Sequence, residues 1–474
     1  MLLHAMIFLL LAFAAAASRA SAQEPPARRM GPLHPHEMNP RYFADGDGNP
    51  VCLTGSHTWA SLQDFSATDP PEAFDFPGYL DFLEQHHHNF IRLWRWEPAR
   101  TTLSQGGLRF ATPHPWPRLG PELAPDGKPR FDLHQFDETY FDRLRERVLA
   151  ARDRGIYVSI MLFEGWALSG TSFDGHPFHV DYNTQGIDGD ADKDGKGFEI
   201  QMLVTERVTE IQEAYVRKVI DTVNDLDNVL YEISNESRLL APEVSSRDWQ
   251  YHFIRLIKQY ESNKPFRHPV GMTSQGYGGG DDSEVLFDSP ADWISPNPDR
   301  HAYKTDPPAA DGRKVILIDT DHLWGIGGDS DWVWKCFFRG LNPIWMDPYD
   351  RAETSWGPRL PEGTAEVRMA LGRVQTLAAR IRLDRLTPHG ELTSSGYCLA
   401  DPGHTYVIYV PAIHQEITID LSAAKGPLKA EWLNLADSQS YSANSVEAGG
   451  EVTLAPPEFD PKSGAVLHLY THQP

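Results

Sequence analysis

From about residue 40 onward, short apolar runs alternate with amphipathic helical stretches along this chain. Eight runs are typical of strands: VCLTG (51–55), NFIRLW (89–94), IYVSIMLF (156–163), VLYEIS (229–234), PVGMT (269–273), WIS (293–295), KVILID (314–319) and PIWMD (343–347). Strands that are apolar at nearly every position are buried on both faces, as in parallel sheets covered by helices.

Eight strand–helix units over roughly 330 residues predict a (β/α)₈ TIM barrel with large loops. A doubly wound open sheet is the alternative architecture. Because no Gly-rich phosphate-binding loop follows the first apolar run, the sequence favours the barrel.

The pattern changes after a helical stretch at about 363–383. The short runs GYCLAD, TYVIYVP, EITIDL, LKAEWLN, EVTLAP and AVLHLY follow one another closely, with Gly, Pro, Asp and Asn turns between them. This spacing predicts an all-β sandwich. We therefore expect a barrel over residues 23–385 and a C-terminal β-sandwich domain over 386–474. No Pro- or Ser-rich linker divides them, so we expect the two domains to pack firmly.

The first 22 residues differ from the rest of the chain. An apolar run, 5–17, precedes Ala20-Ser21-Ala22, a small-x-small cleavage pattern. The run is too short to cross a bilayer. Residues 1–22 are therefore predicted to be a signal peptide, which implies a secreted or periplasmic protein without membrane insertion.

Charge and cysteine usage exclude further classes. The formal charge of −23 repels nucleic acid and anionic membranes, so we expect neither as a partner. The three cysteines are scattered, without metal-ligand spacing or a disulfide framework. Cys52 and Cys398 lie in strand-like runs and are predicted to be buried free thiols.

The active site of such a barrel lies at the carboxyl ends of its strands. Polar side chains follow the apolar runs there, and these include His57, Arg92, Glu164, Asn235, Glu236, Asp319, Asp321, His322 and Asp347. Indoles lie beside them, namely Trp59, Trp94, Trp96, Trp166, Trp324 and Trp345. Carboxylates can supply proton transfer and nucleophilic attack, and indoles stack on sugar rings, so this composition predicts a carbohydrate substrate.

Two of these positions carry a resemblance to a known family. Asn235-Glu236, after the fourth run, resembles the Asn-Glu signature of clan A glycoside hydrolases, and Arg92 resembles that clan's strand-two arginine. The span 40–385 with its C-terminal domain is similar to bacterial apiosidase-like barrels, whose β-domain is named for collagen binding. The resemblance implies that Glu236 is the general acid/base, that Asn235 binds the substrate's 2-hydroxyl, and that no cofactor is required.

The clan's nucleophile is a Glu that closes strand seven, and here the sequence departs from the pattern. Asp319 takes that position, and strand alternation places Asp321 on the same side. Either could be the nucleophile, with Asp319 favoured. Retaining enzymes hold their carboxyls about 5–5.5 Å apart and inverting ones about 6.5–9.5 Å, a choice that the sequence leaves open, although the resemblance favours retention.

The remaining polar residues divide into scaffold and substrate contacts. Glu232, in the middle of its strand, is expected to be a buried acid paired with an Arg or Lys of a neighbouring strand. Substrate contacts are expected from a wider set: Arg92, His57, Trp94, Glu164, Trp166, Asn235, His322, Trp324 and Asp347.

A separate stretch, DGDADKDGKGFE, resembles the start of a calcium-binding loop. Asp190, Asp192, Asp194 and Gly195 match the opening of an EF-hand-like loop. An EF-hand loop has Glu at position twelve, but here that position is Gln201, and the nearest acid is Glu199, two residues earlier. A solvated Asp/Gly loop is the alternative interpretation.

The sequence thus predicts a secreted glycoside hydrolase. A non-catalytic carbohydrate-binding or matrix-adhesion protein on a degenerate barrel is the second hypothesis, and the missing strand-seven Glu favours it. A polysaccharide lyase is the third, and the acid-rich mouth disfavours it.

Overall fold

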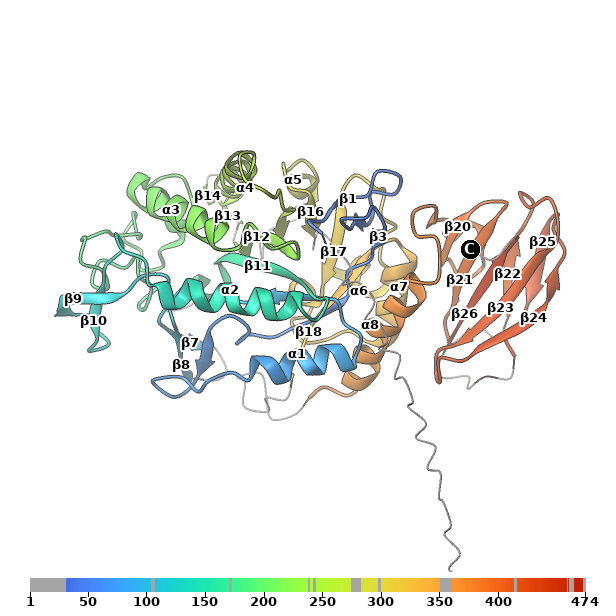
Figure 1. The fold of residues 1–474 in the computed structure, drawn as a ribbon, viewed down its shortest axis with the longest axis horizontal. Helices are drawn as coiled ribbons and strands as arrows, with labels where there is room; N and C mark the ends of the chain where they lie inside the picture. Colours follow the sequence, from blue (N-terminus) through green and yellow to red (C-terminus); the bar gives the residue numbers. More distant parts are fainter. Residues whose placement is uncertain are drawn as a thin grey trace, which may run out of the picture.

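The computed structural model describes residues 31–103, 107–169, 173–237, 239–241, 244–273, 283–296, 300–349, 360–412, 416–457, 459 and 464–471. Figure 1 shows two parts side by side, an α/β barrel and, in red, a C-terminal β-domain. This arrangement confirms the predicted fold class. The exact domain boundary stays a prediction.

Eight parallel strands form the barrel. Their order is β4 (Gly55–His57), β18 (Asn342–Met346), β17 (Val315–Asp319), β16 (Trp293–Ser295), β15 (Val270–Thr273), β12 (Val229–Asn235), β11 (Tyr157–Glu164) and β6 (Phe90–Leu93). The two ends of this order meet, since the Asn89 N–H donates to the Thr54 carbonyl at 3.1 Å. A Cβ on Gly55 would lie 2.0 Å from the Phe90 carbonyl oxygen, so only glycine permits this approach of β4 to β6.

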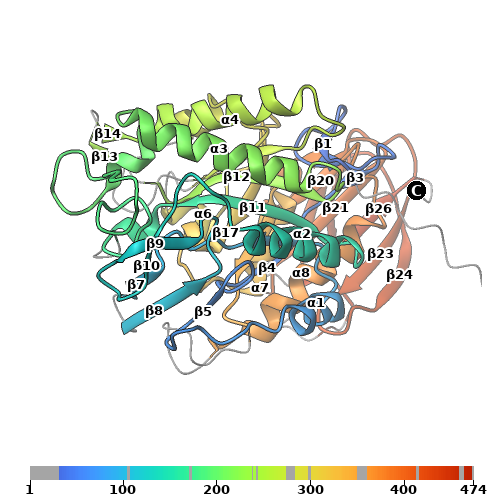
Figure 2. The ribbon, with the colours of Figure 1, turned by 60° about the vertical axis from the view of Figure 1, so that its left-hand side comes forward.

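Helices cover the outside of the barrel. They are α1 (Phe76–Gln85), α2 (Glu138–Arg152), α3 (Glu206–Val223), α4 (Arg247–Glu261), α5 (Ser283–Phe287), α6 (Arg300–Thr305), α7 (Ser330–Phe338) and α8 (Thr364–Ala378). Figure 2 shows α2, α3 and α4 side by side over the strands. Each buries one apolar stripe, such as Val208, Tyr215 and Val219 of α3, against the sheet. Asp75, Asp137 and Asp329 cap the first turns of α1, α2 and α7.

The first barrel strand lies later in the chain than the sequence predicts. Of the run 51–55, Val51 ends β3 (Pro50–Val51), which pairs with β2 (Phe43–Ala44) in a small sheet that also holds β1 (His34–Pro35). The barrel strand is β4, in which Ser56 and His57 are fully buried. Because these residues are polar, hydrophobicity alone missed the strand.

Further short strands extend from the barrel loops. Those not predicted are β5 (Asp64–Ser66), β7 (Arg100–Leu103), β8 (Gly107–Thr112), β9 (Arg118–Leu123), β10 (Pro129–Phe131), β13 (Leu239–Ala241) and β14 (Val244–Ser245). Short 3₁₀ turns are η1 (Trp166–Ser169), η2 (Phe198–Gln201), η3 (Thr320–His322) and η4 (Gly390–Leu392). The large loops expected of the barrel are therefore partly built from hairpins.

The C-terminal domain contains two antiparallel sheets around its own apolar core. One sheet has the order β19 (Thr387–Pro388), β20 (Cys398–Asp401), β21 (Thr405–Val410), β26 (Ala465–Tyr470), β23 (Leu428–Asn434) and β24 (Ser440–Val446). The other pairs β22 (Ile417–Asp420) with β25 (Glu451–Leu454). The six predicted runs are all strands. Strand β24 was missed because only Val446 of its residues is buried.

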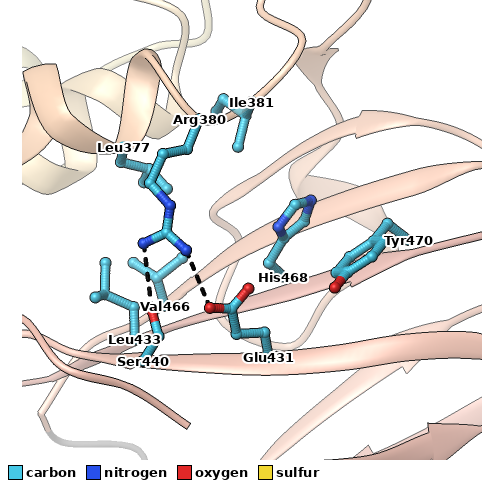
Figure 3. A pocket seen from close by; sticks show the side chains of 9 residues that line it. All are labelled: Leu377, Arg380, Ile381, Glu431, Leu433, Ser440, Val466, His468 and Tyr470. Atoms are coloured by element: carbon cyan, nitrogen blue, oxygen red, sulfur yellow. Dashed lines mark hydrogen bonds and ion pairs between the residues drawn. The ribbon is translucent and has the colours of Figure 1, made fainter. Parts of the chain in front are cut away.

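The two domains meet through α7 and α8. The ring of Tyr409 stacks on Trp334 and Phe338 at centroid distances of 6.2 and 5.8 Å, and its hydroxyl donates to Asp331 at 2.6 Å. Further along the seam, Arg380 of the segment after α8 pairs with Glu431 at 3.0 Å across a cavity of about 230 Å³ (Figure 3). Aromatic and ionic contacts thus join the domains.

Two further predictions concern burial and membranes. Cys52 and Cys398 are buried free thiols, as predicted, and Cys336 is a third. None of the helices in the described part of the chain combines the length and apolar character that a membrane span needs.

Candidate active site

A cavity of about 380 Å³ opens at the carboxyl ends of the barrel strands. The described residues that line it are Trp59, Trp94, Trp96, Trp166, Asn235, Glu236, Asp321, Trp324, Gly325, Ile326 and Met346. Five indoles therefore surround two carboxylates and one amide. Such a cavity offers apolar faces for stacking together with groups for proton transfer.

The buried guanidinium of Arg92 hydrogen-bonds several acidic side chains beside this cavity. Its Nε and Nη2 donate to the two oxygens of Glu232 at 2.8 and 2.6 Å. Its Nη1 donates to Asp319 at 3.0 Å and to Asp321 at 3.1 Å. The predicted pairing of Glu232 with an arginine is confirmed, although Arg92 lies two strands away. Arg92 is 2% exposed and is absent from the described cavity lining, so it acts on the site through its partners.

Asp319 and Asp321 have different surroundings. Both oxygens of Asp319 accept hydrogen bonds, from His57 at 3.0 and 2.9 Å, from Arg92, and from the Asp321 N–H at 2.9 Å. Burial disfavours its charge, but His57 and Arg92 outweigh burial and lower the pKa of Asp319. Asp319 therefore lies below the cavity as a fixed anion.

Asp321, by contrast, lines the cavity. It follows β17 in the turn η3, which Asp319 caps. Burial raises the pKa of Asp321 to about 6; Arg92 opposes this shift, and the negative charge of Asp319 adds to it. The carboxyl is therefore ionised at neutral pH and protonated in mild acid.

Asn235 is held in one orientation. Its Oδ1 accepts from Arg92 Nη2 at 2.8 Å and from His322 Nε2 at 3.2 Å. Burial and the charge of Arg92 lower the pKa of His322 to about 3, so the ring is neutral; its Nδ1 then accepts from the Ser295 hydroxyl at 2.8 Å. With Oδ1 occupied, the Nδ2 amide is the donor of this side chain, and one of its two N–H groups hydrogen-bonds Glu164.

Glu236 follows β12 in an unusual backbone conformation. Its φ is +48°, in the left-handed region, and the residue is 5% exposed. An L-residue in this region costs about 1–2 kcal/mol relative to the right-handed one, and such strain gathers at functional sites. The turn places Glu236 in the lining of the cavity.

Other predicted contact residues lie away from the cavity. Glu164 is fully buried and accepts the Trp166 and Ala167 N–H groups at 2.7 and 2.8 Å; burial raises its pKa to about 8, although these bonds and Asn235 oppose the shift. Asp347 is also fully buried, in a bidentate pair with Arg368 at 2.6 and 2.8 Å. Both carboxylates support the loops around the site.

The indoles divide differently from the prediction. Trp94, Trp166 and Trp324 line the cavity, as expected of sugar platforms, and so do Trp59 and Trp96. Trp345 instead donates its N–H to the Gly327 carbonyl at 2.8 Å and is buried. Trp59 and Trp96 follow the first two strands, so the sequence places them beside the site, but they are not among the predicted substrate contacts.

The predicted calcium ligands are only partly brought together. Asp190 and Asp192 each place a carboxylate oxygen close to one of Glu199, all within 4.8 Å. Asp194 is not part of this group, because its carboxylate pairs with Lys196. Asp194 is therefore replaced by Glu199 in the candidate set.

Comparisons with known proteins identify the fold. No protein-family model matches the chain, and no curated protein sequence matches it. Among solved structures, a protein described as a glycoside hydrolase is 12% identical, with a TM-score of 0.58 over 93% of this chain and 97% of that chain. A glycoside hydrolase family 5 protein from Bacteroides vulgatus is 13% identical, with a TM-score of 0.58 over 94% of this chain and 95% of that chain. At these identities the match establishes a shared fold over nearly the whole chain.

Proposed function

We propose that this protein is a glycoside hydrolase that uses Glu236 and Asp321 as its two catalytic carboxylates. The observation that carries the proposal is the cavity in which both carboxylates face five indoles at the carboxyl ends of the barrel strands. Its likeness in fold to solved glycoside hydrolases supports the same reaction class. The apiosidase-like subtype is part of this proposal and rests on the sequence resemblance.

In the proposed reaction, Asp321 attacks the anomeric carbon while Glu236 gives its proton to the departing glycosidic oxygen. The C–O bond to the leaving group breaks, and a glycosyl ester forms on Asp321. Glu236, now ionised, takes a proton from water, which attacks the same carbon and frees Asp321. Two displacements retain the anomeric configuration, as the Asn235-Glu236 resemblance implies.

The surrounding residues are positioning residues in this scheme. Arg92 stabilises the ionised form of Asp321 at 3.1 Å, and Asp319 with His57 holds Arg92 in place. Asn235 lines the cavity, and of its two Nδ2 N–H groups one hydrogen-bonds Glu164 while the other is assigned to a substrate hydroxyl. This assignment moves the nucleophile from Asp319, favoured by sequence position, to Asp321.

No cofactor enters the proposed reaction. Export to the periplasm or the medium is also a proposal, because the predicted signal peptide, 1–22, lies outside the described residues. The substrate is a neutral or weakly charged glycan, since the described cavity lining includes no Lys or Arg to pair with a sugar carboxylate.

A screen of plant, algal and bacterial polysaccharides tests the proposal. We expect the wild-type protein to release reducing sugar from at least one polysaccharide, and Glu236→Gln to lose at least about 10²-fold in turnover. NMR of the first-formed product should show the retained anomer. Binding to a glycan without any release of sugar, in both proteins, would favour the carbohydrate-binding hypothesis instead.

A further inference from the structure

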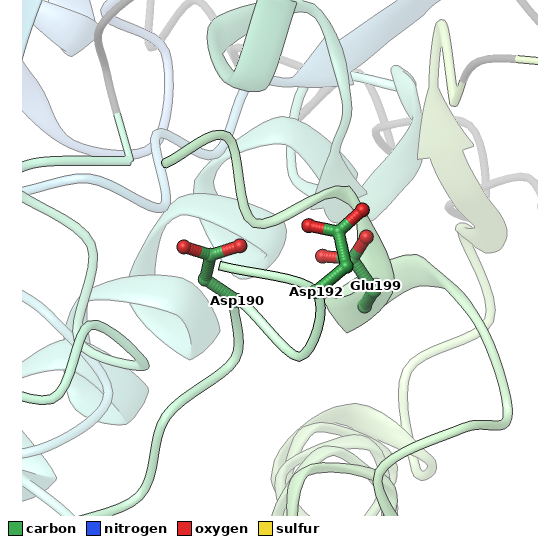
Figure 4. A group of neighbouring side chains, drawn as sticks. All are labelled: Asp190, Asp192 and Glu199. Carbon is green, nitrogen blue, oxygen red and sulfur yellow. The ribbon is translucent and has the colours of Figure 1, made fainter. Parts of the chain in front are cut away.

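We infer that the loop before η2 binds one Ca²⁺ through Asp190, Asp192 and Glu199. Figure 4 shows the three carboxylates, two from the loop and Glu199 from the short helix that follows it. One oxygen of each lies within 4.8 Å of the others. Two oxygens bound to the same Ca²⁺ at about 2.3–2.6 Å lie at most about 5.2 Å apart, so the group fits this ion without rearrangement.

The buried carboxylate of Glu199 is the observation that points to a ligand. The residue is 9% exposed, and its Oε2 has no hydrogen-bond partner among the described residues. Leaving a carboxylate oxygen buried and unpaired beside two further acids is costly unless a cation completes the site.

Neighbouring cations do not neutralise the group. Lys193 pairs with Asp188, and Lys196 pairs with Asp194. Within the described residues, no Lys, Arg or His forms an ion pair with Asp190, Asp192 or Glu199. Lys193 and Lys196 interact with these acids only at longer range, and three carboxylates without a direct ion pair favour a hard divalent ion with oxygen ligands.

The backbone of the loop is shaped to present the carboxylates. Asp190 accepts the N–H groups of Asp194 and Gly195 at 3.1 and 2.9 Å, which curls the chain around its side chain. Gly195, with φ +85°, allows the turn at the place where an EF-hand loop also has glycine. An EF-hand loop takes its last ligand from position twelve. Here Glu199, at position ten, takes that role, because it lies in η2 with a carboxylate oxygen close to that of Asp190.

The ion would brace the later part of the long loop between β11 and α3, which packs against the earlier part. Phe173 packs against Gly197, where a Cβ would lie 2.3 Å from its ring, and the Ile200 carbonyl accepts from Gln212 of α3 at 2.7 Å. The same loop begins with Trp166 on the cavity wall. Calcium therefore stabilises a segment that borders the active site, and the inference stands independently of the proposed hydrolase activity.

Isothermal titration of the EDTA-stripped full-length protein with CaCl₂ tests the site, with thermal unfolding as a second measurement. We expect one Ca²⁺ per chain, a Kd between micromolar and millimolar, and a rise in Tm of at least about 2 °C at saturating ion. Glu199→Gln and Asp192→Asn should each weaken binding at least tenfold. Asp194→Asn, in the same loop but outside the group, should bind as the wild type does.

Two outcomes would overturn the inference. One is a wild-type protein that shows neither heat nor a change in Tm with calcium. The other is equal calcium binding by the wild type, Glu199→Gln and Asp192→Asn, which would place the ion elsewhere. Asp192 is exposed, so Asp192→Asn decides the question even if Glu199→Gln does not fold.

Discussion

Asp319 and Asp321 are two residues apart, yet only one of them reaches the cavity. Asp319 ends β17, and its two carboxylate oxygens accept hydrogen bonds from His57, Arg92 and the Asp321 N–H. Asp321 follows in η3, and its side chain extends over Arg92 into the cavity. The acid that ends the strand is thus followed, two residues later, by a second acid that lines the cavity.

The raised pKa of Asp321 predicts the acid limb of the pH profile. A nucleophile must be ionised, and burial raises the pKa of Asp321 to about 6. We therefore expect kcat/KM to fall about tenfold per pH unit below pH 6. The measurement is the initial rate at low substrate concentration between pH 4 and 8.

The variant Asp319→Asn tests whether the pKa of Asp321 causes the fall of kcat/KM in acid. Asp319 contributes to the raised pKa of Asp321, so Asp319→Asn removes a negative charge and should move the limb to lower pH. A limb that stays near pH 6 in this variant, or one that is absent in the wild type, would contradict the assignment.

At this scale the sequence predicted the residue types but not every direction in which they point. The pairing of Glu232 with an arginine followed from its position in the middle of a strand. Glu164 and Asp347 also close strands, yet backbone N–H groups and Arg368 hold them away from the cavity. The partners that decide this lie on other elements, and their positions follow only from the folded barrel.

At the scale of elements, the ends of β11 and β12 touch where the site is built. The Gly165 N–H donates to the Asn235 carbonyl at 2.7 Å. A Cβ on Gly165 would lie 2.7 Å from Ser237 Cα and 2.8 Å from the Glu236 carbonyl oxygen. Position 165 must therefore be glycine, because any side chain there would collide with the backbone of Glu236 and Ser237.

Gly165→Ala should push this backbone away from β11. We expect a loss of about 1–3 kcal/mol in the free energy of unfolding, and at least about a tenfold loss in kcat because Glu236 is displaced. Chemical denaturation and steady-state kinetics measure the two effects. Gly426→Ala is the control, since a Cβ there meets nothing within 4 Å. Equal stability and activity in both variants would refute the role given to Gly165.

Element prediction succeeded where burial produced apolar runs and failed where it did not. Seven of the eight barrel strands coincide with the predicted runs over most of their length, because strands covered on both faces are apolar throughout, whereas β4 shares only Gly55 with its run. Strand β4 carries buried Ser56 and His57, and β24 is exposed, so neither has that signature.

At the scale of the whole molecule, the barrel and the C-terminal domain share an aromatic seam. Tyr409 is 3% exposed between Trp334 and Phe338, and its hydroxyl donates to Asp331 of α7. The absence of a flexible linker in the sequence predicted firm packing, and these contacts are consistent with it. Which side chains form the seam depended on the register of β21 and could not be predicted.

Tyr409→Phe tests the energetic part played by this seam. The variant keeps the ring stack but removes a partly buried hydrogen bond to a carboxylate, so we expect the protein to lose about 1–2 kcal/mol of stability. A lower Tm in calorimetry measures the loss. Tyr441→Phe, at a site that is 40% exposed and whose hydroxyl donates to Asp437 over a longer 3.4 Å, should change Tm much less. The same Tm in both variants would show that the hydrogen bond adds nothing.

The turnover of Asp321→Asn and Asp319→Asn, measured on a glycan that the wild type cleaves, decides which acid is the nucleophile. If Asp321 is the nucleophile, Asp321→Asn should lose at least about 10³-fold in kcat, while Asp319→Asn keeps measurable turnover because it acts only through Arg92 and His57. Near-wild-type turnover by Asp321→Asn, with Asp319→Asn inactive but folded, would contradict the assignment of Asp321 and make Asp319 the nucleophile.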